Sequence, residues 1–595
     1  MKRNVTITAT LLGIAVFAVY AALAARDLMF GDALELVASA ARDGVAHPPG
    51  YPLWIAIAHL ATLVPLGPLP YRANLTAAAF HAVTVTLVYA SGYVLVRRHG
   101  AALFAALLLA IASPLFVQWS LQAETFSLND LFAAAIVLLC LLWLEDARRW
   151  RLVVPIALLF GLGLSNQQTL VLLAPLPLWA AWRGRSAMKS ARNVRPTLAF
   201  AALALLASFW LPYLHTILAS QRLPDWQFAA ARTFSELIDL IDRRVYGTLT
   251  LTTDASLQGG SPAQRATRLL LLGSWPYLAV AAGLVGLALR KRYAEIVFAA
   301  LIVIGPLVAF CAVANMNSEL PRAMFGRFGL LPLVALAPFS GPATFLLESL
   351  VRSRPLRTLL AGLALCVAFV PTTLHLPALS LAAVHGPRTL SRDIFAALPP
   401  HAILLANADA LALPPQYFQA IEGWRPDVTI IIDALLDRPA YQNDLKRTID
   451  VPPSFAGLDW PIGRRDLLAR ANPSRAFFVA AEGSDILILP GPLYKPLAEG
   501  VVSQMIPLGA RTDVYHHYQH EVALQSRPGY ADLSADWKSN GFAQEVRAVY
   551  ADGFFFTGQD AKDLGNRKAA RYWFERAATY EPNLRIGAEL QLDSR

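Results

Sequence analysis

Long apolar runs through residues 1–380 constrain this 595-residue chain more than any other feature. A helix needs roughly 20 apolar residues to cross about 30 Å of hydrocarbon. The chain is 56% hydrophobic and only 15% charged, whereas soluble domains carry about 25% charged residues. We therefore expect a polytopic α-helical membrane protein with about 11 transmembrane helices. The candidate spans are 5–25, 73–96, 101–117, 128–145, 152–165, 168–182, 196–218, 269–289, 294–314, 327–349 and 357–379.

Basic residues gather in the segments between these runs. The clusters are Lys2-Arg3, Arg97-Arg98, Arg148 to Arg151, Arg183 to Arg195, Arg290 to Arg292 and Arg352 to Arg357. All fall on one side if the N-terminus is cytoplasmic and every span crosses, as the positive-inside rule requires. The pattern predicts a bacterial inner (cytoplasmic) membrane protein with a periplasmic C-terminal domain. It also argues against nucleic acid as a partner, although the net charge is +10.

The N-terminus has a competing interpretation as a cleaved signal peptide. Lys2-Arg3, an apolar run and Ala22-Leu23-Ala24 imitate one. The run of about 20 residues exceeds the usual apolar region of 7–15 residues, which favours an uncleaved first helix. The segment 31–54 and the loops 114–127, 218–268 and 315–326 then lie on the outer side. The three cysteines lie inside apolar runs and are interpreted as small core residues.

Two carboxylates, Asp32 and Glu35, follow the first apolar run almost without a spacer. Acids beside membrane spans are costly unless hydrated or paired, so they are candidates for function. Their spacing places them on one face of a short helix. The structural alternative is a helix cap at Asp32 with Glu35 as its capping-box partner, and it stays open.

A proline-rich segment, His47-Pro48-Pro49-Gly50-Tyr51-Pro52, comes next. Its three prolines each fix a φ angle and its glycine adds one unrestricted residue, so the pattern predicts a stiff turn. The turn carries an imidazole, which is a proton donor or phosphate partner near neutral pH.

Further polar residues fall on the outer side. The loop 113–130 contains Gln118, Trp119, Glu124 and Asn129. Trp119 fits an interfacial aromatic belt, whereas Glu124 is a candidate for function.

The positive-inside rule predicts few arginines on the outer side, so the arginines found there require an explanation. Arg243 and Arg244 precede Tyr246, and Arg322 and Arg327 flank the start of a span. Snorkelling or pairing with loop acids is one explanation, and a clamp for a lipid phosphate is the other.

The order of these motifs resembles a bacterial membrane family long catalogued as a domain of unknown function. The motifs are "GVAHPPGYPLW", "QWSLQAETFSLN", "GLGLSNQQTL", "RRVYG" and "ALPPHAILLANADALALPPQYFQAIEGWRPDV", and the resemblance covers roughly residues 10–430. That family is related to the eukaryotic transmembrane O-mannosyltransferase of plexin-type receptors, and more distantly to protein O-mannosyltransferases. The resemblance implies a GT-C glycosyltransferase fold, a polyprenyl-phosphate sugar donor and an acid in the first outer loop as the base.

Carried over residue by residue, the acid motif falls on Asp32 and Glu35. The remaining family motifs fall on His47, Pro48, Gly50, Tyr51, Glu124, Arg243, Arg244 and Tyr246. One departure matters: relatives tend to have Asn-His-(His)-Thr where this chain has Asn166-Gln167-Gln168-Thr169. This chain therefore lacks any contact that the histidine makes in relatives.

The predicted reaction is an inverting transfer of a mannose-like hexose or pentose. Asp32 deprotonates the acceptor hydroxyl, and Glu35 is the second catalytic residue. The predicted substrate- and donor-binding residues are His47, Tyr51, Glu124, Asn129, Asn166, Arg243, Arg244, Tyr246, Arg322 and Arg327. No cofactor is expected; a divalent metal, used by some relatives, stays the alternative, since the acids are too dispersed to give a ligand signature.

The C-terminal part has ordinary soluble composition. Short β-like runs such as "AILLAN" and "VTIIID" predict an α/β domain over 385–545. Asp409 comes just after the first of these runs, where it is either a ligand contact or a turn residue. Residues 546–595 predict one tetratricopeptide-like helix pair, from Phe554, Gly558, Ala570, Phe574, Ala577 and Pro582. We expect this part to recognise the acceptor or to cover the outer site.

Three rival functions stay open. A transporter or flippase of lipid-linked sugars usually shows internal repeats and broken helices, and we find neither. A structural anchor for the C-terminal part leaves the outer acids unexplained. A ligase of a lipid-linked glycan uses the same chemistry with a larger donor. The sequence does not distinguish a protein, lipid or glycan acceptor.

Overall fold

A computed structural model describes residues 3–222, 229–248, 250–251, 258–273, 275–317, 322–455, 462–481, 493–527, 530 and 543–581. Tertiary contacts divide the chain into two compact units. The membrane unit comprises residues 1–26 and 39–383, and the C-terminal unit comprises residues 27–38 and 384–595. The short segment 27–38, which begins helix α2 (Asp32–Arg42), therefore groups with the C-terminal unit and not with its neighbours in sequence.

The membrane unit is helical, since a chain in lipid must satisfy its own backbone hydrogen bonds. Among the described residues, six helical segments are long and apolar enough to cross a membrane, and the bent pair α13 (Pro262–Gly273) and α14 (Trp275–Leu289) would be a seventh. Four of the six are single helices: α1 (Arg3–Leu23), α4 (Leu69–Val96), α7 (Thr125–Glu145) and α11 (Val194–Arg222). The fifth, residues 293–313, consists of α15 (Tyr293–Ile302), η5 (Val303–Ala309) and α16 (Phe310–Val313). The sixth, residues 326–350, consists of η6 (Gly326–Gly329), α18 (Leu330–Leu336), η7 (Ala337–Ser340) and α19 (Ala343–Leu350).

Shorter helices complete the membrane unit. They are α3 (Pro52–Thr62), α5 (His99–Ala110), α6 (Pro114–Trp119), η1 (Ala147–Leu152), α8 (Val153–Leu164), η2 (Gln168–Leu173), α9 (Pro175–Arg183), α10 (Arg185–Lys189), α12 (Phe234–Ile241), η3 (Arg244–Tyr246) and α17 (Arg322–Phe325). Helix α20 (Arg354–Leu379) ends the unit.

The expected count of about 11 full spans is not confirmed. The candidate 101–117 is divided between α5 and α6, because Pro114 starts a new helix that Ser113 caps at the Phe116 N–H. The candidate 152–165 contains α8, whose 12 residues extend about 18 Å. The candidate 168–182 is divided into η2 and α9, with Pro175 at the start of α9.

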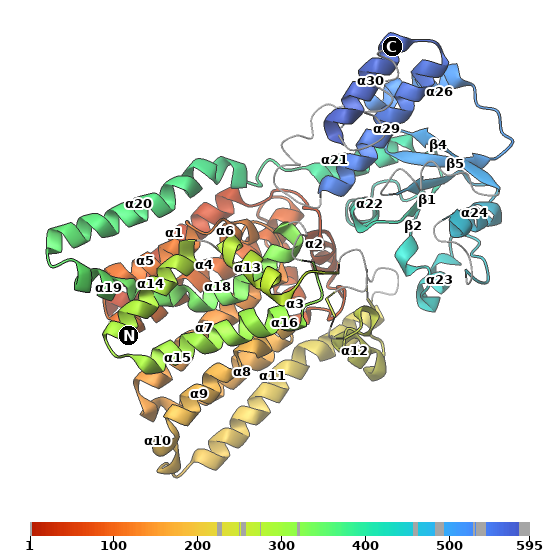
Figure 1. Cartoon of the computed structure of the whole chain (residues 1–595). Coiled ribbons are helices and arrows are strands. Elements are labelled where there is room, and N and C mark those ends of the chain that lie inside the picture. The colour runs from red at the N-terminus through yellow and green to blue at the C-terminus, as the bar shows by residue number, and fades with distance from the viewer. Residues whose placement is uncertain are drawn as a thin grey trace. The chain divides into compact units, whose positions relative to one another are not determined.

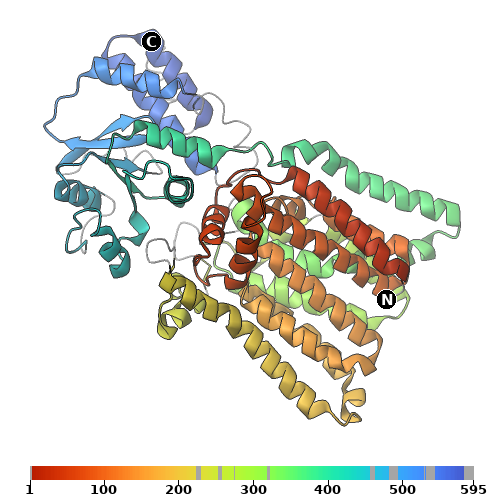
Figure 2. The same ribbon diagram turned by 180° about the vertical axis from the view of Figure 1, so that it is seen from behind.

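Helices of the membrane unit approach each other closely where side chains are small. Helices α4 and α7 lie side by side, as do α8 and α11 (Figures 1 and 2). A Cβ atom added to Gly161 of α8 would clash with the Leu205 carbonyl oxygen of α11. Glycine at this position lets the two helix backbones meet, as is common between membrane helices.

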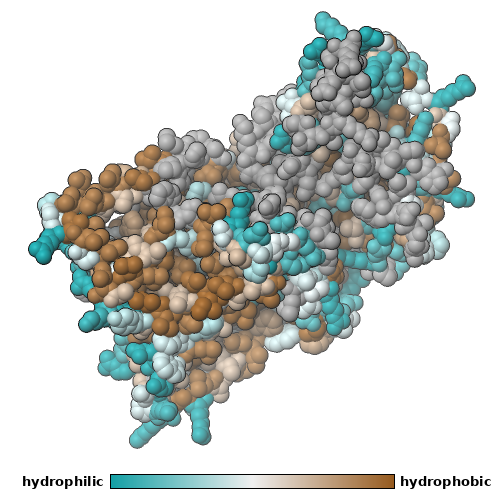
Figure 3. Space-filling model, viewed as in Figure 1, coloured by the Kyte–Doolittle hydropathy of each residue, from teal (hydrophilic) through white to brown (hydrophobic). Residues whose placement is uncertain are grey.

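The outer surface of the membrane unit is apolar. Figure 3 shows hydrophobic residues over the visible helices of this unit. Leu203, Leu206 and Leu211 of α11 and Leu278 of α14 are all more than half exposed. A continuous apolar surface of this kind requires a lipid environment, so the chain is a membrane protein.

Ion pairs gather the basic loops at one end of the membrane unit. Glu348 pairs with Arg98, with Arg290 at 2.9 Å and with Arg357 at 3.5 Å. Arg97 pairs with Glu145 at the end of α7. We call this end of the membrane unit the basic end. Residues from four of the basic clusters seen in the sequence, or from the helices that flank them, meet there.

The opposite end carries other charged residues. Helix α7 begins after Glu124 and runs 21 residues to Glu145, which is about 31 Å at 1.5 Å per residue. The 326–350 run likewise has Arg327 near its start and Glu348 near its finish. Glu124 and Arg327 therefore lie at the end away from the basic loops, which we call the site end.

Buried polar side chains hold the chain together at the site end. The Asn74 amide nitrogen donates to the Ala25 carbonyl at 2.9 Å, and its oxygen accepts from the Ala123 N–H at 2.8 Å. Ala25 in turn donates its N–H to the Leu121 carbonyl at 2.9 Å. One fully buried amide thus joins α4 to the end of α1 and to the segment that leads into Glu124.

A second buried group lies beside the first. His81 contacts the Ser120 hydroxyl through Nδ1 at 2.7 Å and the Asp130 carboxyl through Nε2 at 3.1 Å. All three side chains are shielded from solvent. These contacts join α4, the end of α6 and the first turns of α7, and so fix the segment 120–124 between them.

Replacing Asn74 by leucine is expected to destabilise the protein by about 1–3 kcal/mol for each backbone group left unpaired. The Ala25 carbonyl and the Ala123 N–H lose their partner, while the side-chain volume is kept. Thermal unfolding in detergent measures the effect, with Val83→Ala on the exposed face of α4 as the control. A melting temperature for N74L equal to that of V83A would contradict the assignment.

The described residues of the C-terminal unit form a five-stranded mixed sheet in the order β2-β1-β3-β5-β4. The strands are β1 (Ile403–Ala406), β2 (Thr429–Ile432), β3 (Phe477–Ala480), β4 (Tyr494–Glu499) and β5 (Val502–Pro507). Strands β2, β1 and β3 are parallel, and β5 and β4 join antiparallel. The parallel strands are short and buried on both faces, as expected where helices cover a sheet.

Helices surround this sheet. They are α21 (Gly386–Ala397), α22 (Asp409–Glu422), η8 (Asp433–Leu435), α23 (Pro439–Leu445), α24 (Ile462–Ala471), α26 (Val514–Gln525), α29 (Ala543–Asp563) and α30 (Arg567–Tyr580). Asp409 is the exposed first residue of α22, where a carboxylate stabilises the helix dipole. Helices α29 and α30 pack together with Gly558 against the Phe574 ring; Pro582 lies outside the described residues.

A fully buried carboxyl joins α26 to the turn between β4 and β5. Both oxygens of Glu521 accept from the Gly500 N–H, at 2.9 and 3.2 Å. Burial raises the pKa of Glu521 to about 8. The neighbouring His517 also has a raised pKa, to about 9: burial lowers it, but the hydrogen bond to Asp560, the charges of Asp560 and Glu521 and the Ala498 carbonyl together outweigh burial.

The stability of the C-terminal unit is expected to fall as pH rises from about 5 to 9. Glu521 and His517 both bind protons more tightly when folded, so the unfolded chain releases protons first and ∂ΔG/∂pH is negative. Each fully linked proton contributes about 1.4 kcal/mol per pH unit. Hydrogen exchange of α26 against pH measures the slope, and Glu521→Gln is expected to flatten it between about pH 5 and 8. An unchanged slope would contradict the protonated Glu521.

Candidate functional site

The proline-rich segment forms a closed turn in front of α3. The Gly50 N–H donates to the His47 carbonyl at 2.7 Å, and Gly50 has a φ of 91°. Tyr51 is also left-handed, with φ of 45°, at the N-cap of α3. This backbone brings the Tyr51 hydroxyl within 3.1 Å of Nε2 of His47. The two predicted binding side chains are thereby held together.

The arginine–tyrosine motif lies next to this turn. Leu240 at the end of α12 stands 3.0 Å from where a Cβ on Gly50 would be. Three residues later, Arg243 adopts a left-handed conformation, with φ of 53°, and places its guanidinium 5.4 Å from the Tyr246 ring centroid. The structure therefore brings together two motifs that are almost 200 residues apart in sequence.

The two neighbouring arginines differ in their partners. Arg244 pairs with Asp239 of α12 at 2.8 Å, which matches the alternative of pairing with a loop acid. Arg243 is half-buried and has no ion pair within the part of the chain that the structure describes. Arg243 is thus the better candidate for binding an anion.

Glu124 is the N-cap of α7. Its Oε1 accepts from the Thr125 N–H at 2.9 Å, and its Oε2 lies 3.4 Å from Nη1 of Arg327. The Glu124 side chain is 3% exposed and that of Arg327 is 15% exposed. The Arg327 guanidinium also lies 5.5 and 5.7 Å from the ring centroids of Phe126 and Phe328. A carboxylate and two aromatic rings therefore orient this cation.

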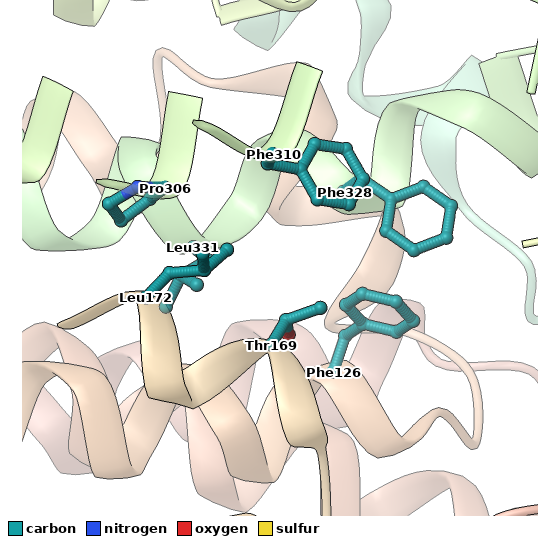
Figure 4. Close-up of a pocket in the computed structure, with 7 residues that line it drawn as sticks. All are labelled: Phe126, Thr169, Leu172, Pro306, Phe310, Phe328 and Leu331. Carbon is teal, nitrogen blue, oxygen red and sulfur yellow. The ribbon is translucent and has the colours of Figure 1, made fainter. Parts of the chain in front are cut away.

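A small apolar cavity adjoins the same aromatic rings. It is lined by Phe126, Thr169, Leu172, Pro306, Phe310, Phe328 and Leu331. Figure 4 shows Phe126 and Phe328 on the same side of this cavity, with Leu172 and Pro306 at the other. The site end thus combines a half-buried arginine with an apolar lining.

Two predicted asparagines lie near Glu124. The Asn166 amide nitrogen donates to the Thr125 carbonyl at 3.0 Å, which joins the end of α8 to the start of α7. Asn129 lies one turn further along α7 and is fully buried. The Asn166 Oδ1 and both polar side-chain atoms of Asn129 have no hydrogen-bond partner among the described residues. Buried amide groups of this kind are suited to bind a polar ligand.

Asp32 and Glu35 occupy the first turn of α2 in the C-terminal unit. Asp32 is the first residue of the helix and is partly exposed, whereas Glu35 is 5% exposed. The Arg322 side chain lies outside the described residues. Among those residues, no group of three or more His, Cys, Asp or Glu side chains is placed to hold a metal ion.

The chain is similar in sequence to known protein O-mannosyl-transferases. Residues 32–190 match the family model of the protein O-mannosyl-transferase TMEM260 N-terminal domain. The chain is 35% identical over 244 residues to protein O-mannosyl-transferase TMEM260 of Mus musculus, and 28% identical over 196 residues to that of Dictyostelium discoideum. The resemblance predicted from the sequence is confirmed.

These relatives are much longer than the matched region. The matches cover 40% and 30% of this chain, and 34% and 24% of the two relatives. The fold resembles the crystal structure of ArnT from Cupriavidus metallidurans bound to undecaprenyl phosphate, with a TM-score of 0.51 and 12% identity. That comparison covers 86% of this chain and all of the other, and it shows a GT-C fold.

The family match includes part of the predicted site. Asp32, Glu35, the 47–52 turn, Glu124, Asn129 and Asn166 lie inside residues 32–190. Arg243, Arg244, Tyr246, Arg322 and Arg327 lie outside that range. Within the membrane unit, Leu240 lies against Gly50 and Arg327 against Glu124, so the described members of the second group lie beside the 47–52 turn and Glu124.

The sequence did not reveal three polar groups of the membrane unit. Asp43 accepts from Arg222 at 2.9 Å and lies 2.9 Å from Nε2 of His215, both on α11. His215 and Arg222 are seven residues apart, which is two helical turns, so their shared face was a readable signal. Asn74 and the His81–Asp130 pair were missed because single polar residues in apolar runs carry no local pattern.

Replacing Gly50 by alanine is expected to destabilise the turn by about 1–3 kcal/mol, because its left-handed conformation is unfavourable for alanine. The added Cβ would also press on Leu240 at 3.0 Å. The matched control is Gly100→Ala, since nothing lies within 4 Å of that position. Thermal unfolding is expected to show a lower midpoint for G50A than for G100A; equal midpoints would contradict the packed turn.

Proposed function

We propose that this protein is an integral-membrane glycosyltransferase that moves a sugar from a polyprenyl-phosphate donor to an acceptor hydroxyl. The carrying observation is the O-mannosyl-transferase match over residues 32–190 in a chain with a GT-C fold. The ArnT structure is described as bound to undecaprenyl phosphate, a polyprenyl phosphate, which supports this class of donor.

The donor phosphate is assigned to the cations of the site end. Arg327 is oriented by Glu124 and by two aromatic rings that also line the apolar cavity. A polyprenyl phosphate has an anionic head and an apolar tail, so an arginine beside an apolar lining fits both of its parts. Arg243 and His47 are assigned as further phosphate partners, since the Gly50–Leu240 contact brings their loops together.

The transferred sugar is assigned to the asparagines at the start of α7. Hydroxyl groups both donate and accept hydrogen bonds, and so do amide side chains. The unpartnered buried atoms of Asn129 and Asn166 support this assignment. A buried amide without a partner in the protein gains a hydrogen bond from a ligand hydroxyl, which makes the site selective for a polar group.

The acid of the first outer loop is assigned as the base. Asp32 takes the proton of the acceptor hydroxyl, whose oxygen attacks the anomeric carbon while the bond to the lipid phosphate breaks. The phosphate leaves as an anion and is stabilised by Arg327 and Arg243. The attack from the face opposite the leaving group inverts the anomeric centre. Glu35, buried in the same helical turn, orients Asp32.

We also propose that the site end faces the periplasm of a bacterial inner membrane. The basic end, with Arg97, Arg98, Arg290 and Arg357, has the charge expected of the cytoplasmic side. The proposed donor and acceptor then meet on the opposite side, where the cytoplasmic charge bias does not apply.

Transfer by the purified protein tests the proposal. The donors are polyprenyl-phosphate mannose, glucose and arabinose, and mass spectrometry of protein, lipid and glycan acceptors detects the product. Asp32→Asn is expected to lower kcat by about 10²–10⁴-fold, since it removes the base. Arg327→Ala is expected to lower kcat/KM for the donor, while Arg192→Ala, exposed in a basic loop, serves as the control.

Two results would contradict this function. Wild-type transfer by Asp32→Asn would exclude the assigned base. Movement of the lipid-linked sugar across vesicles without its consumption would favour the transporter instead. The same assay with and without EDTA tests the metal-free reaction, for which equal rates are expected.

A further inference from the structure

Asp27 follows the first membrane helix and is 4% exposed. Its Oδ1 accepts from the N–H of Leu28 at 2.9 Å and from Nη2 of Arg388 at 3.2 Å. Its Oδ2 accepts from Nε of Arg388 at 2.5 Å and lies 3.3 Å from Nδ1 of His385. Two parallel contacts between a guanidinium and a carboxylate form the strong bidentate type of ion pair.

Arg388 is itself held on its other side. Nη1 and Nη2 each donate to Glu422 at 2.8 Å. Its guanidinium carbon lies 4.6 and 5.5 Å from the ring centroids of Phe418 and Trp424. Glu422 and Phe418 belong to α22, so Arg388 is a rigid bridge between the helical layer of the C-terminal unit and Asp27. A lysine has no planar fork and cannot make both bidentate contacts.

The residues after Asp27 continue into this unit. Leu28, Met29 and Phe30 are each at most 5% exposed. Gly31 then turns with a φ of 90°, and α2 begins at Asp32. Asp32 comes five residues after Asp27, a reach of at most about 18 Å. The buried ion pair and three buried side chains therefore determine where the first turn of α2 lies within the C-terminal unit.

We propose that Arg388 is a positioning residue for the transfer reaction: through Asp27 it holds the segment 27–38 and sets the place of the Asp32 carboxylate. The inference rests on the proposed function, because it concerns the base of that reaction. The proposal gives the C-terminal unit a role in catalysis, because the segment with both predicted catalytic acids is part of that unit. Arg388 touches neither donor nor acceptor and acts through Asp27.

The alternative is that Arg388 only stabilises the packing of α21 on α22. The two explanations differ in what Asp27→Asn does. That variant leaves the Arg388–Glu422 pair and both aromatic contacts in place, and it removes the charge that anchors the segment 27–38. A packing role predicts little effect of D27N on turnover, whereas a positioning role predicts a loss equal to that of Arg388→Gln.

Steady-state transfer and hydrogen exchange on the full-length protein test the proposal. D27N and R388Q are each expected to lower kcat at least tenfold and to leave KM for the donor within twofold, because the donor contacts are assigned to other residues. Arg388→Lys is expected to regain part of the loss, since it keeps one charged contact. The matched control is Arg392→Gln, an exposed arginine of the same helix that lies over Trp424 and makes no contact with Asp27 among the described residues.

Hydrogen exchange supplies a readout that is independent of activity. Amides of residues 27–38 are expected to exchange at least tenfold faster in D27N and R388Q than in the wild type, while strand β1 is unchanged. Unchanged exchange of this segment, or a kcat for D27N equal to that of R392Q, would overturn the proposal. Absence of transfer by the wild type would overturn the proposed function instead, and exchange would still decide whether the anchor exists.

Discussion

A polar side chain inside an apolar helical bundle needs a partner, and this requirement organises the site end of the membrane unit. Asn74 satisfies two backbone groups from distant segments, and His81 joins Ser120 to Asp130. Leaving any of these groups unpaired in a membrane costs several kcal/mol. The segment 120–124 consequently has one favourable position, and the start of α7 follows from it.

That position decides the role of Glu124. Its carboxylate caps α7 and at the same time pairs with Arg327, which lies 203 residues later in the chain. Helix capping was considered for Asp32 and Glu35 from their spacing; at Glu124 the structure shows a cap, through the Thr125 N–H. The two oxygens of this carboxylate serve stability and site geometry together, because one caps α7 and the other orients the guanidinium beside the rings of Phe126 and Phe328.

The grouping of residues 27–38 with the C-terminal unit changes how the chain is divided functionally. A boundary near residue 380 separates the apolar part from the soluble part by composition, and it assigns Asp32 and Glu35 to the apolar part. The contacts assign these acids to the C-terminal unit, because Asp27 is buried against Arg388. A buried carboxylate is stable only beside its cation, so its partner determines its unit and its position in the chain does not.

The sequence by itself determined the properties that depend on local composition. Long apolar runs predict the membrane helices, the basic clusters predict the end that Glu348 gathers, and the order of the motifs identifies the relatives. Tertiary structure alone decided the pairings between distant charges, such as Arg388 with Asp27, 361 residues apart. It also decided which apolar runs form long helices, since Pro114 and Pro175 start new helices inside predicted spans. The physical reason is that hydropathy is a property of a segment, whereas a buried charge or amide is satisfied only by whatever the fold brings beside it.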